Sequence, residues 1–257
     1  MPHQKTSGAP GVTALPVHSF DLGIAPYLPL QELQRRLREA VADGRVTGIL
    51  LLLEHEPVIT LGTRAGTGDL RGASLRQAAG RLTGTVAREE ASPGGRVIEL
   101  VKSERGGQAT LHAPGQLVCY PVVPIPDHDL SSYVHGLEEA LILLLSGLGI
   151  TATRRRGAPG VYVGTDKIAS VGLRCSRWVA SHGTSLNVDM DLSLFDLIVS
   201  CGEPDLHQTS IAALTDVRPS MRDIKRAYLE AAREIFGWDL LPLRSVTHER
   251  VETELRL

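Results

Sequence analysis

The apolar residues of this chain fall into two spacings, one typical of amphipathic helices and one typical of short buried strands. Helical spacing predicts three helices, over residues 30–43, from Ser131 or Ser132 as a cap to about 146, and over 219–235. Each is followed by glycine, as is common at helix C-termini, at Gly44, at Gly147 or Gly149, and at Gly237.

Short apolar runs predict strands between these helices. They lie at 48–54, 96–102, 117–123, 160–163, 167–174 and 178–188. Residues 62–95 are rich in Gly, Ala and Arg with weak periodicity, so we expect mostly loop there, with a short helix near 75–81. The order of elements predicts a fold that mixes α and β structure.

No repeat or linker divides the chain, so we expect one domain over residues 25–240. Residues 1–24 begin with a mixture of Pro, Gly, Ser and Thr without periodicity, and we expect a mobile tail. Residues 241–257 are expected to form a peripheral C-terminal segment.

Composition narrows the class of protein. The 257 residues include 27 Lys and Arg and 29 Asp and Glu, for a net charge of −2, with 42% hydrophobic and 22% charged residues. These proportions exclude a disordered chain or a coiled coil, and the charge balance disfavours general nucleic-acid binding. The longest aliphatic run, Ala140–Leu145, is far below the ~20 residues that span a bilayer. The first twenty residues hold no apolar core of signal-peptide type. We therefore expect a cytoplasmic protein without a membrane segment.

The cysteines are Cys119, Cys175 and Cys201, an odd and widely spaced set that does not form a disulfide framework. The absence of Cys-x-x-Cys and His-x-x-x-His pairs gives a structural zinc site little support. Each cysteine is therefore a small buried hydrophobe or a reactive thiol.

Four polar segments carry candidate chemistry. The glycine-rich segment 105–116 either approaches a ligand with its backbone or forms a solvated hairpin turn. Lys167, within an apolar strand, needs a partner or a function unless its amine reaches water at the strand edge. His182 and Gly183 interrupt a strand, which indicates a bulge, a close approach to a ligand or a core histidine. Cys201 ends an apolar run at a turn, and a lysine beside it would favour its thiolate.

Taken together, these segments resemble the lipoyl(octanoyl) transferases, which move an octanoyl group from acyl carrier protein to a protein lysine in lipoate biosynthesis. The matching segments occur in order: LLLEHEPVITLG at 51–62, RGGQATLHAPGQLVCYPV at 105–122, GAPGVYV at 157–163, DKIASVGLR at 166–174, SRWVASHGTSLNV at 176–188 and FDLIVSCGE at 195–203. The resemblance implies an α/β (α+β) fold like the catalytic domain of biotin and lipoate protein ligases, with a mixed sheet and packed helices.

The resemblance also implies roles for particular residues. Cys201 would be the nucleophile that carries the acyl group as a thioester, and Lys167 would lower its pKa and act as acid and base. The residues that would bind the acyl group are Arg105, Gly106, Gly107, Gln108, Ala109, Thr110, Leu111, His112, Ser170, Val171, Gly172, Gly183, Thr184 and Ser185.

The implied partners are acyl carrier protein as donor and, as acceptors, the lipoyl domains of 2-oxoacid dehydrogenase E2 subunits and the glycine cleavage H protein. No metal or other cofactor is expected, because the phosphopantetheine arm arrives with the donor. Such partners are generally acidic, and Arg154–Arg156, Arg174 and Arg177 are candidates for a basic rim.

The chain departs from the family pattern at three positions. Ala113 replaces a usual glycine and requires a negative φ, Ser185 replaces an alanine, and Glu203 replaces an apolar residue and would oppose a thiolate at Cys201. Three other functions remain open: an ATP-dependent lipoate or biotin ligase, a hydrolase that pairs Cys201 with His182 or His112, and a non-catalytic acyl-protein-binding relative.

Overall fold

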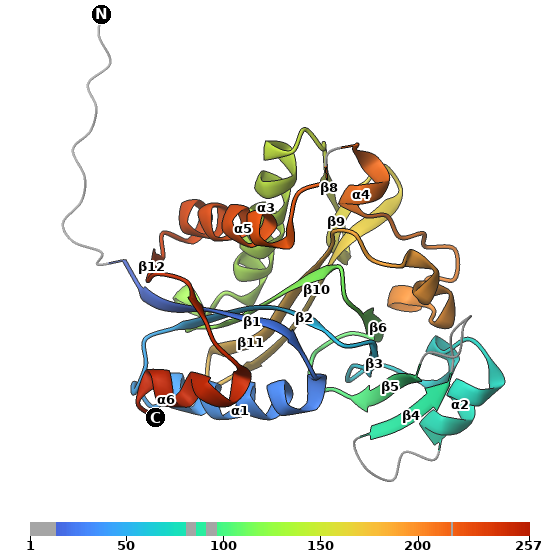
Figure 1. The fold of residues 1–257 in the computed structure, drawn as a ribbon, viewed down its shortest axis with the longest axis horizontal. Coiled ribbons are helices and arrows are strands. Elements are labelled where there is room, and N and C mark those ends of the chain that lie inside the picture. The colour runs from blue at the N-terminus through green and yellow to red at the C-terminus, as the bar shows by residue number, and fades with distance from the viewer. Residues whose placement is uncertain (1–13, 81–85, 91–96, 217) are drawn as a thin grey trace, which may run out of the picture.

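The computed structural model describes residues 14–80, 86–90, 97–216 and 218–257, and gives no side-chain detail for 86–90. Its main feature is a large mixed sheet with helices on both faces (Figure 1). A smaller sheet lies beside one end of the large one.

Within the described residues the large sheet has nine strands, in the order β12-β1-β2-β7-β11-β10-β9-β8, with β13 also beside β1. The pairs β1–β2, β1–β12 and β1–β13 are parallel. The remaining neighbours in the sheet, β2–β7, β7–β11, β11–β10, β10–β9 and β9–β8, are antiparallel. The strands are β1 (Pro16–Ala25), β2 (Ile49–His55), β7 (Gln116–Val122), β8 (Thr153–Arg155), β9 (Ala158–Val163), β10 (Asp166–Ser176), β11 (Val179–Asn187), β12 (Asp239–Leu240) and β13 (Arg244–Ser245).

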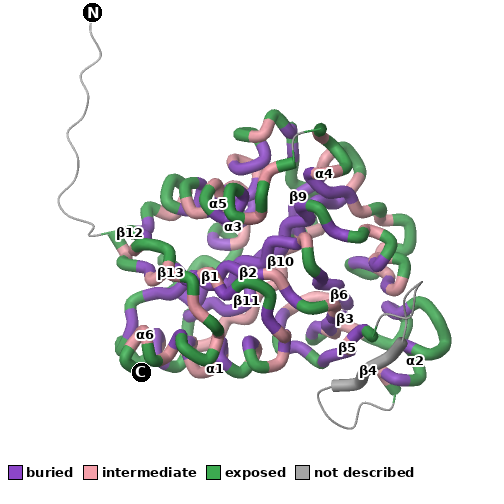
Figure 2. The backbone as a smooth tube through the Cα atoms, in the orientation of Figure 1, coloured by how far each residue is buried: buried purple, intermediate pink, exposed green. Residues whose placement is uncertain are grey.

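Helices cover the two faces of this sheet. Helices α3 (Leu130–Gly147) and α5 (Met221–Phe236) enclose one core, and α1 (Tyr27–Ala42) and α6 (Val251–Leu255) contribute to the other. Central strands β7 and β11 are buried along their whole length, because both of their faces are covered. Figure 2 shows buried residues concentrated in the central strands and exposed residues on the outer helices. The predicted helices and long strands and the mixed sheet are confirmed.

Two helix boundaries are set by caps. The side chain of Asp129 accepts a hydrogen bond from the Ser132 N–H at the start of α3, so the predicted cap at Ser131 or Ser132 is wrong. Asp129 is the better cap because its carboxylate lies just outside the first turn. Helix α5 ends at Gly237 in the left-handed conformation, as predicted, but it begins at Met221 with Ser220 as its cap, two residues later than the predicted start at 219.

The smaller sheet was not predicted. It has the order β4-β5-β3-β6, from β3 (Val58–Leu61), β4 (Val86–Glu90), β5 (Val97–Lys102) and β6 (Ala109–His112), and it shares a core with α2 (Ala73–Gly80). The short helix predicted near 75–81 is confirmed as α2, whereas β4 lies in a segment predicted as loop; residues 81–85 and 91–95 lie outside the described residues. Strands of four residues are too short to show a periodic pattern.

Both ends of the chain differ from expectation. Residues 16–24, assigned to the tail, form most of β1, whose side-chain alternation is broken by a register shift between Asp21 and Ile24. In the segment 241–257, β13 extends the sheet and Val251 of α6 is fully buried. Residues 1–13 lie outside the described residues, and the domain limits 25–240 stay a prediction.

Candidate active site

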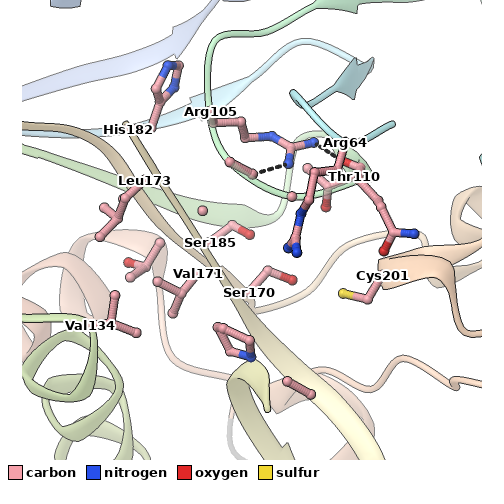
Figure 3. A pocket seen from close by; sticks show the side chains of 18 of the residues that line it. Arg64, Arg105, Thr110, Val134, Ser170, Val171, Leu173, His182, Ser185 and Cys201 are labelled. Atoms are coloured by element: carbon pink, nitrogen blue, oxygen red, sulfur yellow. Dashed lines mark hydrogen bonds between the residues drawn. The ribbon is translucent and has the colours of Figure 1, made fainter. Parts of the chain in front are cut away.

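A cavity of about 290 Å³ lies where the two sheets meet, between the loop at 105–108, strands β10 and β11, the start of α3 and the turn that bears Cys201 (Figure 3). Its volume is near the lower end of the range for small-molecule sites. Of the predicted site residues, those in this cavity are Arg105, Gly106, Gly107, Gln108, Ala109, Thr110, His112, Lys167, Ser170, Val171, Gly172, Gly183, Thr184, Ser185 and Cys201.

Leu111 is the predicted pocket residue that does not line the cavity. Its side chain is fully buried in the core of the smaller sheet, with Ile59 and Leu100. Successive side chains of a strand point to opposite faces, so Thr110 and His112 of β6 face the cavity while Leu111 faces the core. We therefore remove Leu111 from the predicted acyl-binding set.

Lys167 is buried within β10 and only 1% exposed. Its Nζ donates hydrogen bonds to the Pro159 carbonyl oxygen at 2.9 Å and to the Cys201 sulfur at 3.1 Å, and lies 5.3 Å from the centre of the Tyr162 ring. The alternative of an edge lysine with its amine in water is therefore wrong. A buried amine needs such partners, because burial disfavours its charged form.

The path of the Lys167 side chain depends on Gly160 of the neighbouring strand β9. Gly160 has φ +133°, and a Cβ there would lie 2.5 Å from both the Lys167 Cε and the Ala169 carbonyl oxygen. Glycine alone leaves this space, and it lets the lysine stem cross the adjacent strand. The GAPGVYV segment thus shapes the channel for the amine.

Cys201 is exposed on the short 3₁₀ turn η4 (Ser200–Gly202) and has φ +57°, a left-handed conformation. The chain is tied to its surroundings on both sides of this turn. Before it, the Val199 N–H donates to the Asp69 carbonyl oxygen at 2.8 Å. After it, the backbone of Lys167 accepts from the Thr209 N–H at 2.9 Å and donates to the His207 carbonyl oxygen at 3.0 Å. These last two bonds bring the thiol to the amine across 34 positions of sequence.

The glycine-rich turn is organised by Arg105. Its buried guanidinium donates to the Thr60 carbonyl and hydroxyl oxygens and to the carbonyl oxygens of Gly106 and Gln108, at 2.7–3.1 Å. Burial lowers the pKa of this guanidinium from its usual value. The Gly106 N–H is occupied by the Leu173 carbonyl oxygen at 2.8 Å. Arg105 thus shapes the cavity wall by holding the loop.

The two histidines considered as partners of Cys201 are buried. Burial, with Arg105 and Arg38 nearby, lowers the pKa of His182 to about 3, and burial lowers the pKa of His112 well below its usual value. The His112 Nδ1 is bonded to Gln116 Oε1 at 2.6 Å. Within the described residues the hydrogen-bond partner of the Cys201 sulfur is Lys167, and no bond joins it to a histidine. This geometry favours a Cys–Lys site over a Cys–His dyad.

Strand β11 continues through His182, and its pairing with β10 has no register shift there, whereas its pairing with β7 covers Thr184–Asn187. The His182 residue adopts φ +56°, and its own N–H donates to Gln34 Oε1 at 2.6 Å. The predicted break in the strand is therefore wrong for the β10 side, although the backbone is locally left-handed at His182. Gly183–Ser185 beyond it line the cavity.

The departures from the family pattern fit the structure. Ala113 is buried and lies outside the left-handed region, as its methyl group requires. Ser185 lines the cavity. The carboxylate of Glu203 forms an ion pair with Arg155.

Most of the suggested basic rim is paired with acidic groups. Arg154 contacts Glu138 and Glu139, Arg177 contacts Asp43, and Arg174 lies 4.0 Å from Glu104. Arg156 has no ion pair among the described residues. These pairs reduce the free positive charge that the rim offers to an acidic partner.

Several lining residues lie outside the predicted set of acyl-binding residues, although His182 and Glu203 among them were considered from the sequence for other roles. They are Arg64, Tyr120, Leu130, Val134, Gly157, Ala158, Pro159, Leu173, His182 and Glu203. Leu130 and Val134 are one helical turn apart at the start of α3. This spacing in the sequence could have predicted that both side chains lie on the same face of the helix. Arg64 reaches the cavity from the loop after β3, whose position no local pattern predicts (Figure 3).

In the part of the chain that the structure describes, no group of three or more His, Cys, Asp or Glu side chains is placed to hold a metal ion. Among the same residues, no helix is long and apolar enough to cross a bilayer.

The fold and the site define a class: an α/β protein whose exposed cysteine, held beside a buried lysine at a partly apolar cavity, can form a thioester with an acyl group. A family comparison narrows this class. The lipoyl protein ligase A/B catalytic domain matches residues 26–233, and the chain belongs to this family.

Curated relatives agree with this assignment. The chain is 39% identical over 233 residues to an octanoyltransferase of Chloroflexus aggregans, covering 89% of this chain and 97% of that protein. It is 40% identical over 220 residues to an octanoyltransferase of Desulfovibrio desulfuricans, covering 84% and 86%.

Solved structures share the fold. A bi-partite lipoate protein ligase of Thermoplasma acidophilum has a TM-score of 0.66 at 16% identity, covering 93% of this chain and 92% of that one. A lipoate-protein ligase A bound with ATP has a TM-score of 0.65 at 16% identity, covering 93% of each chain. The expected lipoate-ligase-like fold is confirmed.

Proposed function

We propose that this protein is an octanoyltransferase that moves an octanoyl group from acyl carrier protein to the lysine of a lipoyl domain, through a thioester on Cys201. The observation that carries the proposal is the 3.1 Å contact between the Lys167 Nζ and the Cys201 sulfur at the cavity. The names of the curated relatives support octanoyl as the acyl group.

The first step is an exchange of thioesters. The Cys201 thiolate, stabilised by the Lys167 ammonium, attacks the carbonyl carbon of the donor thioester. A bond forms between the Cys201 sulfur and this carbon, the bond to the carrier sulfur breaks, and the departing thiolate takes a proton from Lys167. One thioester replaces another, so this step is close to energetic balance.

The second step forms an amide. The acceptor lysine must lose a proton before it attacks, because a free ammonium with pKa near 10.4 is mostly protonated at neutral pH. That proton goes to solvent, the neutral amine attacks, and the nitrogen–carbon bond forms. As the Cys201 thiolate leaves, Lys167, neutral after the first step, accepts the second proton, which the nitrogen must lose to become an amide. The lysine then carries its proton again, beside the thiolate, as at the start.

The oxyanion formed in each step needs a donor. Two backbone N–H groups near the cavity, those of Gly106 and Gly202, already donate to the carbonyl oxygens of Leu173 and Val199. The side-chain amide of Gln108 packs against Gly202, so that a Cβ there would collide with it. This contact supports the Gln108 amide as a donor, worth roughly 3 kcal/mol if well placed.

The family acts on lipoyl domains, and the acceptors proposed here are those of 2-oxoacid dehydrogenase E2 subunits and the glycine cleavage H protein. The proposal includes the cytoplasm as the place of action. It requires no cofactor in the protein, since the donor brings its own phosphopantetheine.

The test is intact-mass analysis after mixing the protein with octanoyl-carrier protein. We expect one octanoyl adduct without ATP, transferred to a lipoyl domain on its addition. The adduct should be absent in Cys201→Ala and present in Cys175→Ala, a matched change at a half-buried cysteine.

Three results would contradict the proposal. An adduct that persists in Cys201→Ala would exclude this nucleophile. Modification of the lipoyl domain from free octanoate and ATP alone would indicate a ligase. Release of free octanoate without an acceptor at the rate of transfer would indicate a hydrolase.

A further inference from the structure

Two charged side chains at the mouth of the cavity have no place in the mechanism above. Glu203 lines the cavity two residues after Cys201, and its carboxylate pairs with the Arg155 guanidinium from β8. The guanidinium also lies over the Tyr162 ring, 4.9 Å from its centre. The centre of the same ring is 5.3 Å from the Lys167 amine. Arg155 therefore links the Cys201 turn to the strands that hold Lys167.

An unpaired carboxylate near a thiol disfavours the thiolate and raises the thiol pKa. A guanidinium beside the same carboxylate offsets this effect, and its own charge favours the thiolate. The hydrogen bond to Glu203 is the largest cause that raises the pKa of the Arg155 guanidinium, so this side chain keeps its positive charge.

A stabilising role for the fold does not explain the pair. Arg155 and Glu203 are 42% and 40% exposed, and ion pairs this exposed add little to the free energy of unfolding. We therefore expect the Arg155–Glu203 ion pair to act on the reactivity of Cys201.

We propose that Arg155 is a positioning residue that holds the Glu203 carboxylate and offsets its charge at Cys201, so that the Lys167–Cys201 pair keeps a reactive thiolate. The proposal rests on the proposed function only in taking Cys201 as the nucleophile.

Other charged or titratable residues line the cavity or lie on segments that neighbour the Cys201 turn. They lie on the loops, strands and turns packed around η4 and are Arg64, Asp69, Arg71, Arg105, His112, Tyr162, Lys167, Asp205 and His207. None of these residues is substituted when only Arg155 or Glu203 is changed. A paired substitution thus isolates the effect of this ion pair.

The experiment is the pH dependence of Cys201 alkylation by iodoacetamide, followed by mass in a Cys175→Ala background. Arg155→Ala should move the midpoint up by about 0.5–1 pH unit, which is roughly three- to tenfold less thiolate at neutral pH. Adding Glu203→Gln should return the midpoint close to that of the parent. Arg155→Lys, which keeps the charge, should shift it least.

The matched control is Arg156→Ala, which removes the same charge from the next residue, where no ion pair is present among the described residues. A shift in Arg156→Ala as large as in Arg155→Ala would overturn the proposal, because it would reflect net charge alone. An unchanged midpoint in Arg155→Ala, or a midpoint that Glu203→Gln fails to restore, would also overturn it.

Alkylation needs neither carrier protein nor octanoyl group, so its outcome is independent of whether the protein transfers octanoyl. Thermal unfolding of each variant supplies the fold control. A loss of stability in Arg155→Ala without a shift of the midpoint indicates a merely structural role and contradicts the proposal.

Discussion

The two partners at the site occupy opposite kinds of structure. Lys167 is buried within β10, a long strand of the large sheet, and its side chain lies against β9, close to the Tyr162 ring of that strand. Cys201 lies on an exposed three-residue turn with a left-handed backbone. The charge-bearing group is thus enclosed, and the nucleophile is presented to the outside.

This difference follows from what each group must do. An ammonium has its largest effect on a thiolate where water is excluded, because the interaction strengthens as the local dielectric falls. A thiol that exchanges acyl groups with two macromolecules must be reachable from solvent. We therefore expect substitutions on the strand side to act on stability and pKa, and those on the turn to act more mildly on the fold.

The largest effect is expected at the amine itself. Lys167→Met keeps the stem but removes the charge, and the rate of octanoyl-adduct formation should fall about 10²-fold or more. The pH profile of Cys201 alkylation should move to higher pH, since the thiolate loses its nearest cation. Mass spectrometry of samples quenched at successive times measures the rate of adduct formation. A rate close to that of the parent would show that the contact with the sulfur has no chemical consequence.

Gly160→Ala tests the channel on the strand side. Its methyl group would meet the Ala169 carbonyl oxygen and Lys167 Cε at 2.5 Å, in a backbone conformation with φ +133°. Because backbone atoms cannot move aside, the free energy of unfolding should fall by about 3 kcal/mol. Urea unfolding gives this value, and a loss below 1 kcal/mol would show that β9 and β10 adapt more freely than described.

The pH dependence of the free energy of unfolding tests whether buried histidines such as His55 stay uncharged in the folded protein. Burial lowers the pKa of His55 to about 4 from 6.5. The unfolded chain therefore binds more protons than the folded protein between these pH values. Stability should be constant above about pH 7.5 and fall on acidification, by about 2 kcal/mol at pH 5 from this residue alone.

Urea unfolding at pH 7.5 and pH 5 measures this loss, and His182 should add to it in the same direction. His55→Gln is the comparison variant, because it keeps a hydrogen-bonding side chain that does not titrate. An equal loss in His55→Gln would exclude His55 as the source.

Gly202→Ala should have the smallest effect on the fold. Its φ of +71° disfavours alanine by about 1–2 kcal/mol, and its methyl group would meet the flexible end of the Gln108 side chain, which can rotate away. We expect a stability loss of about 1 kcal/mol and slower adduct formation from the displaced amide. A larger loss than in Gly160→Ala would reverse the comparison between strand and turn.

The sequence alone predicted the helices and strands that have a strong pattern of apolar residues. Leu33, Leu37 and Ala40 predicted α1, and the continuous apolar run in β2 predicted a strand covered on both faces. The ordered motif segments contain all of the lining residues except Arg64, Leu130 and Val134, although only part of each segment was assigned to the site. Leu111 was included wrongly because a motif does not record which face of a strand each residue occupies.

Other features depend on contacts between distant parts of the chain. β1 was taken for a tail because its alternation is broken at the register shift, and its place in the sheet comes from pairing with β2. The pairing of Arg155 with Glu203 spans 48 positions and has no local signal. The same holds for Lys167 and Cys201, whose meeting follows from the bridge between Lys167 and Gln208.

That bridge ties assembly of the site to two main-chain amides. The Lys167 amide donates to His207, and the Thr209 amide donates back to Lys167, so both bonds break when the segment carrying Cys201 detaches from β10. Protection of these two amides from deuterium exchange therefore reports directly on the fraction of molecules in which thiol and amine are together.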